Sequence, residues 1–142
     1  MNIINDTYQS LYKLPGFIDN EYLINYGHLI DRNINTKLQV KQTHKHHIIP
    51  KCWFKINNLE IDNSITNLVN LKYRDHILAH YYLCLCTDGP LQFANELAFQ
   101  CLLSRKKKVN NYELQVIHSL PLYNYIYENY QNHMKKGIHL YK

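Results

Sequence analysis

The sequence predicts an α+β fold with a very small sheet. Residues 46–49 read as a short strand, residues 68–71 alternate well enough for a second, and apolar side chains recur at helical spacing before and after them. The chain has 142 residues, of which 46% are hydrophobic and 19% charged, as in ordinary globular proteins. We therefore expect one domain, 1–142, in which helices flank two strands at both ends.

Residues 1–42 are expected to form a helical N-terminal extension. Its first part, residues 1–16, looks like a loosely attached lead-in closed by Pro15 and Gly16. Apolar residues at helical spacing then predict a helix over about 19–33, for which Asp19 or Asn20 could serve as the N-cap.

The central segment, residues 43–86, is expected to form the core of the fold. A strand is predicted over 46–49, because proline stops it at Pro50. The stretch 51–66 is predicted to be a loop whose apolar side chains pack down onto the core. A second strand over 68–71 and a helix over about 73–86 complete this segment.

Residues 87–142 are expected to form a helical C-terminal extension. The turn formed by Asp88, Gly89 and Pro90 should precede a helix over about 91–104. A short helix over 112–118 and a last helix starting at Pro121 are expected to follow.

Charge and cysteine usage narrow the class of protein. The net charge of +5 favours an acidic partner such as nucleic acid. The four cysteines form no Cys-x-x-Cys pair, which argues against a four-cysteine zinc ribbon. The N-terminus lacks the apolar region of a secretory signal, and no apolar run approaches the ~18 residues that a membrane span needs. We therefore expect reduced thiols, no membrane partner and a cytoplasmic location.

The histidines carry the chemical signal. His76 and His80 are four residues apart and should project from one helix face, where both rings can hold one metal ion. His46 on the first strand would supply a third imidazole and leave positions open for water and substrate. Because adjacent strand residues face opposite ways, His47 would be free to act as a general base. The alternative for His76 and His80 is a pair of polar residues on a solvated face.

The sequence of this helix does not match the motif of the zinc proteases. Its motif is His-Glu-x-x-His, whereas residues 76–80 read His-Ile-Leu-Ala-His. The glutamate that would act as the base of that mechanism is missing.

Three segments, taken in chain order, carry a resemblance to a known family. They are His-His-Ile-Ile-Pro-Lys (46–51), Asn-Leu-Val-Asn-Leu (67–71) and Arg-Asp-His-Ile-Leu-Ala-His (74–80). Over about residues 22–104 the chain resembles the HNH (ββα-metal) nucleases, above all the phage-type and homing endonucleases. It is also similar to the nuclease domains of colicin-type toxins. The resemblance implies a ββα-metal core, in which a metal-binding helix packs across two short antiparallel strands.

The resemblance implies a role for each matched residue. His46, His76 and His80 would bind one divalent ion, with Mg²⁺ expected first and Zn²⁺, Mn²⁺ or Ni²⁺ as alternatives. His47 would deprotonate the attacking water, with its ring oriented by a backbone carbonyl. Asn67 would pin the loop and hold the strand that carries His47.

The expected activity is metal-dependent hydrolysis of DNA phosphodiester bonds, by nicking or double-strand cleavage, leaving 5′-phosphate and 3′-hydroxyl ends. RNA stays open as a substrate, and the chain could act as a monomer or a homodimer. Two alternatives stay open: a catalytically inactive nucleic-acid-binding protein with a structural metal, and a toxin or defence nuclease.

Two positions depart from the family pattern. His44 stands where glutamate is frequent, and it could be a further ligand, a phosphate contact or an exposed side chain, the last being preferred. Lys72 stands where a hydroxyl residue often caps the metal-binding helix, a loss of about 1 kcal/mol. Asp75 in the first turn would partly offset this loss through the helix dipole.

Basic side chains near these motifs are candidates for phosphate contacts, with solvated surface positions as the alternative. For the basic run 105–108, the alternative is the end of a helix, where positive charges complement the helix dipole. The candidates are Lys45, Lys51, Lys55, Lys72, Arg74 and the basic run Arg105, Lys106, Lys107 and Lys108.

Overall fold

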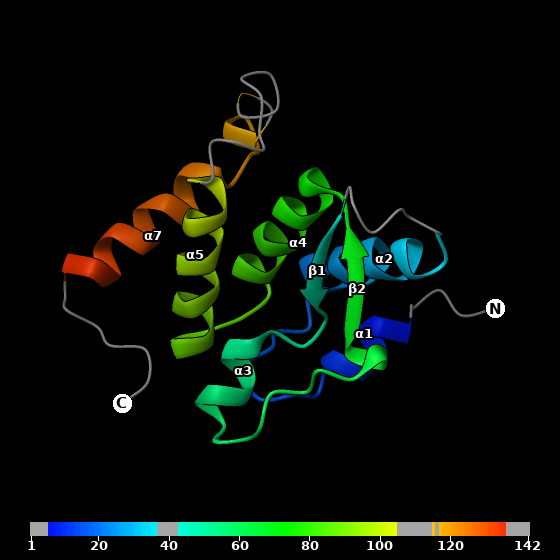
Figure 1. The fold of residues 1–142 in the computed structure, drawn as a ribbon. Coiled ribbons are helices and arrows are strands. Elements are labelled where there is room, and N and C mark those ends of the chain that lie inside the picture. The colour runs from blue at the N-terminus through cyan, green and yellow to red at the C-terminus, as the bar shows by residue number, and fades with distance from the viewer. Residues whose placement is uncertain (1–5, 37–42, 105–114, 116, 136–142) are drawn as a thin grey trace.

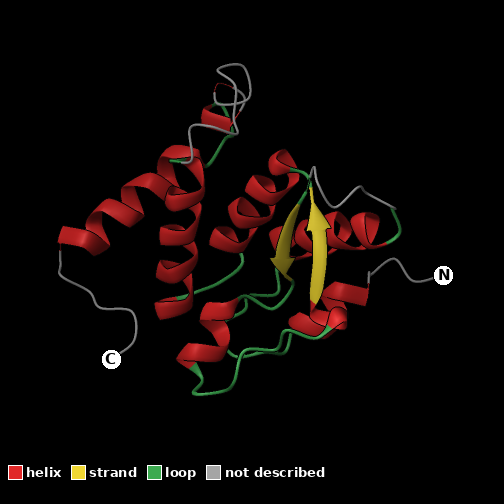
Figure 2. Cartoon of the chain, in the orientation of Figure 1, coloured by secondary structure: helices red, strands yellow, loops and turns green. Residues whose placement is uncertain are grey.

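The computed structural model of the chain describes residues 6–36, 43–104, 115 and 117–135. Over these residues it is a mostly helical α+β fold with one two-stranded antiparallel sheet, which confirms the predicted α+β class (Figures 1 and 2). In chain order the elements are α1 (Asp6–Leu11), α2 (Glu21–Ile34), β1 (His44–His47), α3 (Lys51–Ile56), the 3₁₀ turn η2 (Ile65–Asn67), β2 (Leu68–Leu71), α4 (Tyr73–Leu85), α5 (Gly89–Leu103) and α7 (Tyr123–Lys135).

The sheet fixes which histidines share a face. β1 pairs antiparallel with β2, with His44 opposite Leu71 and His46 opposite Val69. Side chains two apart on a strand point to the same face. His44 and His46 therefore point the same way, and both rings contact His76 of α4. The register of this short ladder thus delivers two imidazoles to one helix.

Helix α4 lies between two hydrophobic clusters and is buried on two sides. Ala79 and Leu83 belong to a cluster formed with α1, α2, α3 and the strands. Ile77 and Tyr81 belong to a second cluster formed with α5 and α7. Figure 1 shows α4 between the strands on one side and α5 on the other. Such a helix is held from both flanks, which suits it to carry ligand side chains at fixed positions.

The N-terminal segment was expected to be loosely attached, and this is wrong for its described part. Residues 6–11 form α1, whose Leu11 is fully buried and whose Tyr8 is buried. Thr7 Oγ1 donates to Asp31 Oδ1 at 2.6 Å, which ties α1 to α2. The segment is too short for helical periodicity to show in the sequence, but its apolar residues fill the first hydrophobic cluster.

The predicted loop over 51–66 is also partly wrong, because residues 51–56 form α3. Its apolar side chains do pack down as expected: Trp53 and Phe54 are buried, and Trp53 Nε1 donates to the Pro15 carbonyl at 2.9 Å. This bond closes the N-terminal turn over α3.

Strand β1 begins two residues earlier than expected and ends at His47, so Ile48 and Ile49 lie in a bend. Helix α5 likewise starts at Gly89, with Pro90 inside its first turn, where proline is tolerated because it needs no hydrogen-bond partner.

Several other expectations are confirmed. Asn20 caps α2, since its Oδ1 accepts from the backbone N–H groups of Tyr22 and Leu23. Helix α4 has the predicted extent, and Lys72 makes no side-chain cap. All four cysteines are free thiols, and Cys84 and Cys86 are buried.

Two expected features lie wholly or partly outside the described residues: the basic run 105–108, and residues 112–114 and 116 of the predicted short helix. Within the described part of the chain, no helix is long and apolar enough to cross a bilayer.

The burial of α1 yields a stability prediction. Leu11→Ala should lower the free energy of unfolding by about 2–5 kcal/mol, because it removes a fully buried side chain and leaves a cavity. Leu59→Ala is the matched control, since Leu59 is 53% exposed and should change stability by no more than about 0.5 kcal/mol. Urea denaturation measures both, and equal stability of the two variants would show that α1 is not part of the core.

Candidate metal centre

Three histidines from two elements come together between the sheet and α4. His46 of β1 and His76 and His80 of α4 each offer a ring nitrogen, and these three nitrogens lie within 4.8 Å of one another. His46 is buried, and the other two rings are half-buried. The structure therefore brings together the three residues that the sequence predicted, in a group that could hold a metal ion.

The spacing of the two helix residues suits a shared ion. His76 Nε2 and His80 Nε2 are 3.3 Å apart. Two imidazole nitrogens bound to one ion at about 2.0–2.1 Å in a tetrahedral arrangement would lie about 3.3–3.4 Å apart. The helix thus presents this pair with the separation that coordination needs.

The electrostatics also favour a neutral ring at His46, as a metal ligand requires. Burial, together with the neighbouring His80, His76 and His47, holds the pKa of His46 well below its usual 6.5. A neutral imidazole keeps a lone pair for a metal.

Two outer groups contact the cluster. The hydroxyl of Tyr26, fully buried on α2, lies 2.8 Å from His46 Nε2. His44 Nδ1 lies 3.1 Å from His76 Nδ1, and the His44 ring meets Tyr73 edge-on. The preferred expectation of an exposed His44 is wrong: the ring is half-buried because it shares a strand face with His46.

His47 stands apart from the three clustered rings. Its Nε2 lies 2.7 Å from Asn63 Oδ1, so the ring donates Nε2–H to that amide oxygen and keeps its lone pair on Nδ1. The expected partner was a backbone carbonyl, and the partner found here is a side-chain amide from the loop before η2.

Asn67 ties that loop to the end of β1. Its Oδ1 accepts from Ile49 N at 2.8 Å, and its Nδ2 donates to the carbonyls of Asp62 at 2.9 Å and Ile49 at 3.3 Å. Its backbone carbonyl accepts from Ile48 N at 2.9 Å. The side chain is buried, so these bonds fix the residues that follow His47 and the residue that precedes Asn63.

The clustered histidines and His47 line one cleft of about 550 Å³. Lys45, Lys51 and Lys55 line it as well, and no carboxylate does so among the described residues. Helix α5 supplies the remaining wall through apolar and small side chains such as Ala94 and Leu97. The cleft thus suits an anionic ligand that has apolar parts.

The other basic residues proposed as phosphate contacts are not found in this cleft among the described residues. Lys72 and Arg74 are exposed near the start of α4 and do not line this cleft. Arg105, Lys106, Lys107 and Lys108 lie outside the described residues.

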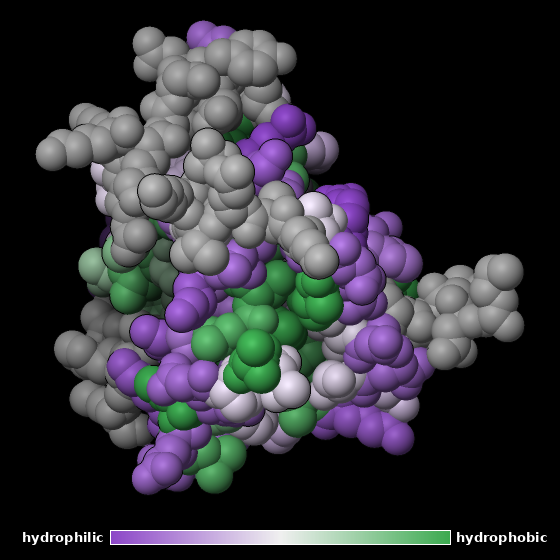
Figure 3. All heavy atoms as spheres, turned by 45° about the vertical axis from the view of Figure 1, so that its right-hand side comes forward, coloured by the Kyte–Doolittle hydropathy of each residue, from purple (hydrophilic) through white to green (hydrophobic). Residues whose placement is uncertain are grey.

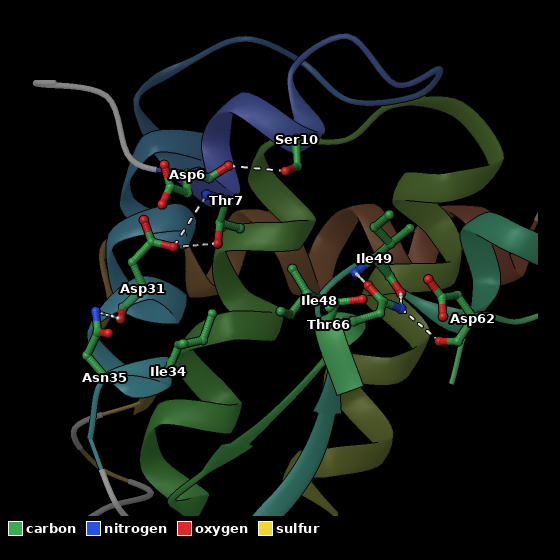
Figure 4. A pocket seen from close by; sticks show the side chains of 11 residues that line it. Asp6, Thr7, Ser10, Asp31, Ile34, Asn35, Ile48, Ile49, Asp62 and Thr66 are labelled. Carbon is green, nitrogen blue, oxygen red and sulfur yellow. Dashed lines mark hydrogen bonds between the residues drawn. The ribbon is translucent and has the colours of Figure 1, made fainter. Parts of the chain in front are cut away.

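A second cavity, of about 640 Å³, shares no lining residue with the cleft. It carries three carboxylates, Asp6, Asp31 and Asp62, and no basic residue from the described part of the chain (Figure 4). Figure 3 brings the right-hand side of Figure 1 forward and shows hydrophobic residues (green) beside hydrophilic ones (purple) on this face. An acidic lining repels a polyanion, so the cleft with the lysines is the better place for one.

Sequence reasoning missed Tyr26, Asn63 and the wall from α5. Tyr26 is an apolar-face member of a helix, and its hydroxyl contact with His46 spans 20 residues. Asn63 is one polar residue in a loop. Neither position has a local pattern that distinguishes it.

Comparison of the chain with protein-family models, curated proteins and solved structures finds no match.

The cluster predicts binding of one divalent ion per chain. His80→Ala should weaken the binding of Zn²⁺ or Ni²⁺ more than about 100-fold, because it removes a direct ligand. Loss of an outer hydrogen-bond partner of a ligand costs only about 10- to 100-fold in metal affinity. Titration calorimetry measures the stoichiometry and affinity. His28→Ala, which removes an exposed histidine of α2, should bind as the wild type does. Equal affinity of the two variants would place the ion elsewhere.

The lowered pKa of His46 predicts an effect of pH on the metal-free protein. Well above pH 6.5 the ring is neutral in both the folded and the unfolded chain. Below that pH the unfolded chain binds the proton first, so the free energy of unfolding should fall as the pH decreases. Urea denaturation at about pH 7.5 and about pH 5.5 should show a smaller loss in His46→Gln than in the wild type. An equal loss in both would mean that His46 does not carry the effect.

Proposed function

We propose that this chain is a metal-dependent DNA endonuclease of the HNH (ββα-metal) type, similar to the phage and homing enzymes. The observation that carries the proposal is the meeting of His46, His76 and His80, with His47 in the same cleft. These four rings are the ones to which the resemblance assigns the metal ligands and the general base. The order of two antiparallel strands, β1 and β2, followed by the helix α4 supports this proposal.

The residues suit hydrolysis of a phosphodiester. A divalent ion bound by the three imidazoles would polarise the scissile phosphate and neutralise the charge that develops on the departing 3′ oxygen. His47 is placed to take the proton of the attacking water on Nδ1, since its Nε2 is engaged by Asn63. Asn67 supports this arrangement by tying the loop near Asn63 to the residues after His47.

The cleft supports a nucleic-acid strand as the substrate. Lys45, Lys51 and Lys55 can contact phosphates next to the one that is cut, and the overall charge of +5 favours the approach of a polyanion. Three imidazoles suit Zn²⁺ or Ni²⁺, whereas Mg²⁺ prefers oxygen ligands, so the assay compares these ions together with Mn²⁺.

The activity predicts metal-dependent nicking of supercoiled plasmid that EDTA abolishes. His47→Ala should lower the nicking rate by about 10²–10⁴-fold, the usual effect of removing a general base, while it binds the metal as the wild type does. Gel electrophoresis follows nicking, and end-labelling should find 5′-phosphate and 3′-hydroxyl ends.

His28→Ala is the control and should nick at the wild-type rate, because this exposed histidine of α2 does not line the cleft. Metal binding without any nicking would favour the nucleic-acid-binding alternative. Full activity in His47→Ala would remove that residue from the role of base.

A further inference from the structure

We propose that Tyr26 and His44 are positioning residues of the metal centre, which fix the ring of His46 with Nδ1 and the ring of His76 with Nε2 turned toward the ion. The inference deepens the proposed function and rests on its metal site. It follows from the hydrogen bonds that each outer group can make.

The Tyr26 hydroxyl has a single hydrogen and two polar neighbours. It lies 2.7 Å from the carbonyl oxygen of Ile48 and 2.8 Å from His46 Nε2. A carbonyl oxygen can only accept, so the hydroxyl donates to Ile48. It must then accept from His46, whose Nε2 carries the hydrogen. The lone pair of His46 therefore lies on Nδ1, the nitrogen left for a metal.

Burial of both side chains stabilises this tautomer of His46. Tyr26 and His46 are 0% and 3% exposed, so water cannot replace either bond at low cost. The Ile48 carbonyl belongs to the bend after β1 whose N–H groups are bound by Asn67. The hydroxyl thus links α2, the end of β1 and the His46 ring in one network.

His44 has the corresponding place beside His76. The two Nδ1 atoms are 3.1 Å apart, and His76 Nε2 faces His80 Nε2. If His76 uses Nε2 for the ion, its hydrogen lies on Nδ1 and is donated to His44. His44 must then present a lone pair on Nδ1. An acceptor is required at position 44, and the imidazole there supplies it.

The first test reads the tautomers of the metal-free protein. Two-bond ¹H–¹⁵N correlation spectra distinguish a ring hydrogen on Nε2 from one on Nδ1. The wild type should show His46 with the hydrogen on Nε2, and the same spectra of the Zn²⁺-loaded protein should show His76 with its hydrogen on Nδ1. Tyr26→Phe should shift His46 toward a mixture. A wild-type His46 with its hydrogen on Nδ1 would overturn the proposal.

The second test measures Zn²⁺ affinity by titration calorimetry. Tyr26→Phe should weaken binding about 10- to 100-fold, the usual effect of losing an outer partner of a metal ligand. Tyr8→Phe is the matched control, because it removes a hydrogen-bonded hydroxyl from α1, where that hydroxyl donates to Asp19. Tyr8→Phe should bind as the wild type does.

A pair of variants at position 44 separates hydrogen bonding from packing. His44→Phe keeps an aromatic ring against Tyr73 and His76 but lacks an acceptor, and it should weaken Zn²⁺ binding about 10- to 100-fold. His44→Gln keeps an acceptor and should bind close to the wild-type value. Equal affinities in these two variants would contradict the proposal for His44, and this pair decides the question if Tyr26→Phe fails to fold.

Metal binding by the three histidines and the positioning roles of Tyr26 and His44 can be tested separately. A wild type that binds no divalent ion would sink the proposed function, while its tautomers could still be read. A wild type that binds the ion, with Tyr26→Phe and His44→Phe binding equally well, would sink only the positioning roles.

Discussion

The site depends on how the two nitrogens of each imidazole are divided between the ion and the scaffold. A neutral ring has one N–H donor and one lone pair, so a partner that accepts at one nitrogen leaves the other for a metal. Three rings within 4.8 Å of one another can serve one ion only if all three lone pairs face inward. The surrounding groups have to enforce that choice, because a buried ring with the wrong tautomer would place an N–H in the position of the lone pair.

The fold meets this demand for His46 and His76 with few residues. Helix α4 is held between two hydrophobic clusters, so the pair at positions 76 and 80 keeps its helical spacing of 3.3 Å between Nε2 atoms. Strand β1 supplies the third ring, and the buried hydroxyl of Tyr26 anchors it from α2. Asn67 then fixes the bend that follows β1. Helices on both flanks of the small sheet thus contribute to the geometry of the cluster.

Much of this could be predicted from the sequence because it depends on local spacing. The i, i+4 separation of His76 and His80 places them on one helix face in any α-helix. Strand alternation separates His46 from the adjacent His47, and the structure leaves His47 outside the clustered rings. The capping role of Asn20 follows from the same kind of local chemistry.

The rest depends on tertiary contacts that no local pattern reveals. Tyr26 looks like a core residue of an amphipathic helix, and its hydroxyl acquires a role only through His46, which is 20 positions away. His44 faces α4 because β1 begins two residues before the predicted start at residue 46, which puts the His44 ring on the same strand face as His46. The helices α1 and α3 have six residues each, which is too short for an apolar period to be distinguished from an irregular segment.

A crystal structure of the protein grown with Zn²⁺, with anomalous scattering recorded at the zinc edge, tests the central claim most directly. The account predicts one strong anomalous peak about 2.0–2.1 Å from His46 Nδ1, His76 Nε2 and His80 Nε2. A peak bound elsewhere, or one that uses His46 Nε2 and displaces the Tyr26 hydroxyl, would contradict it.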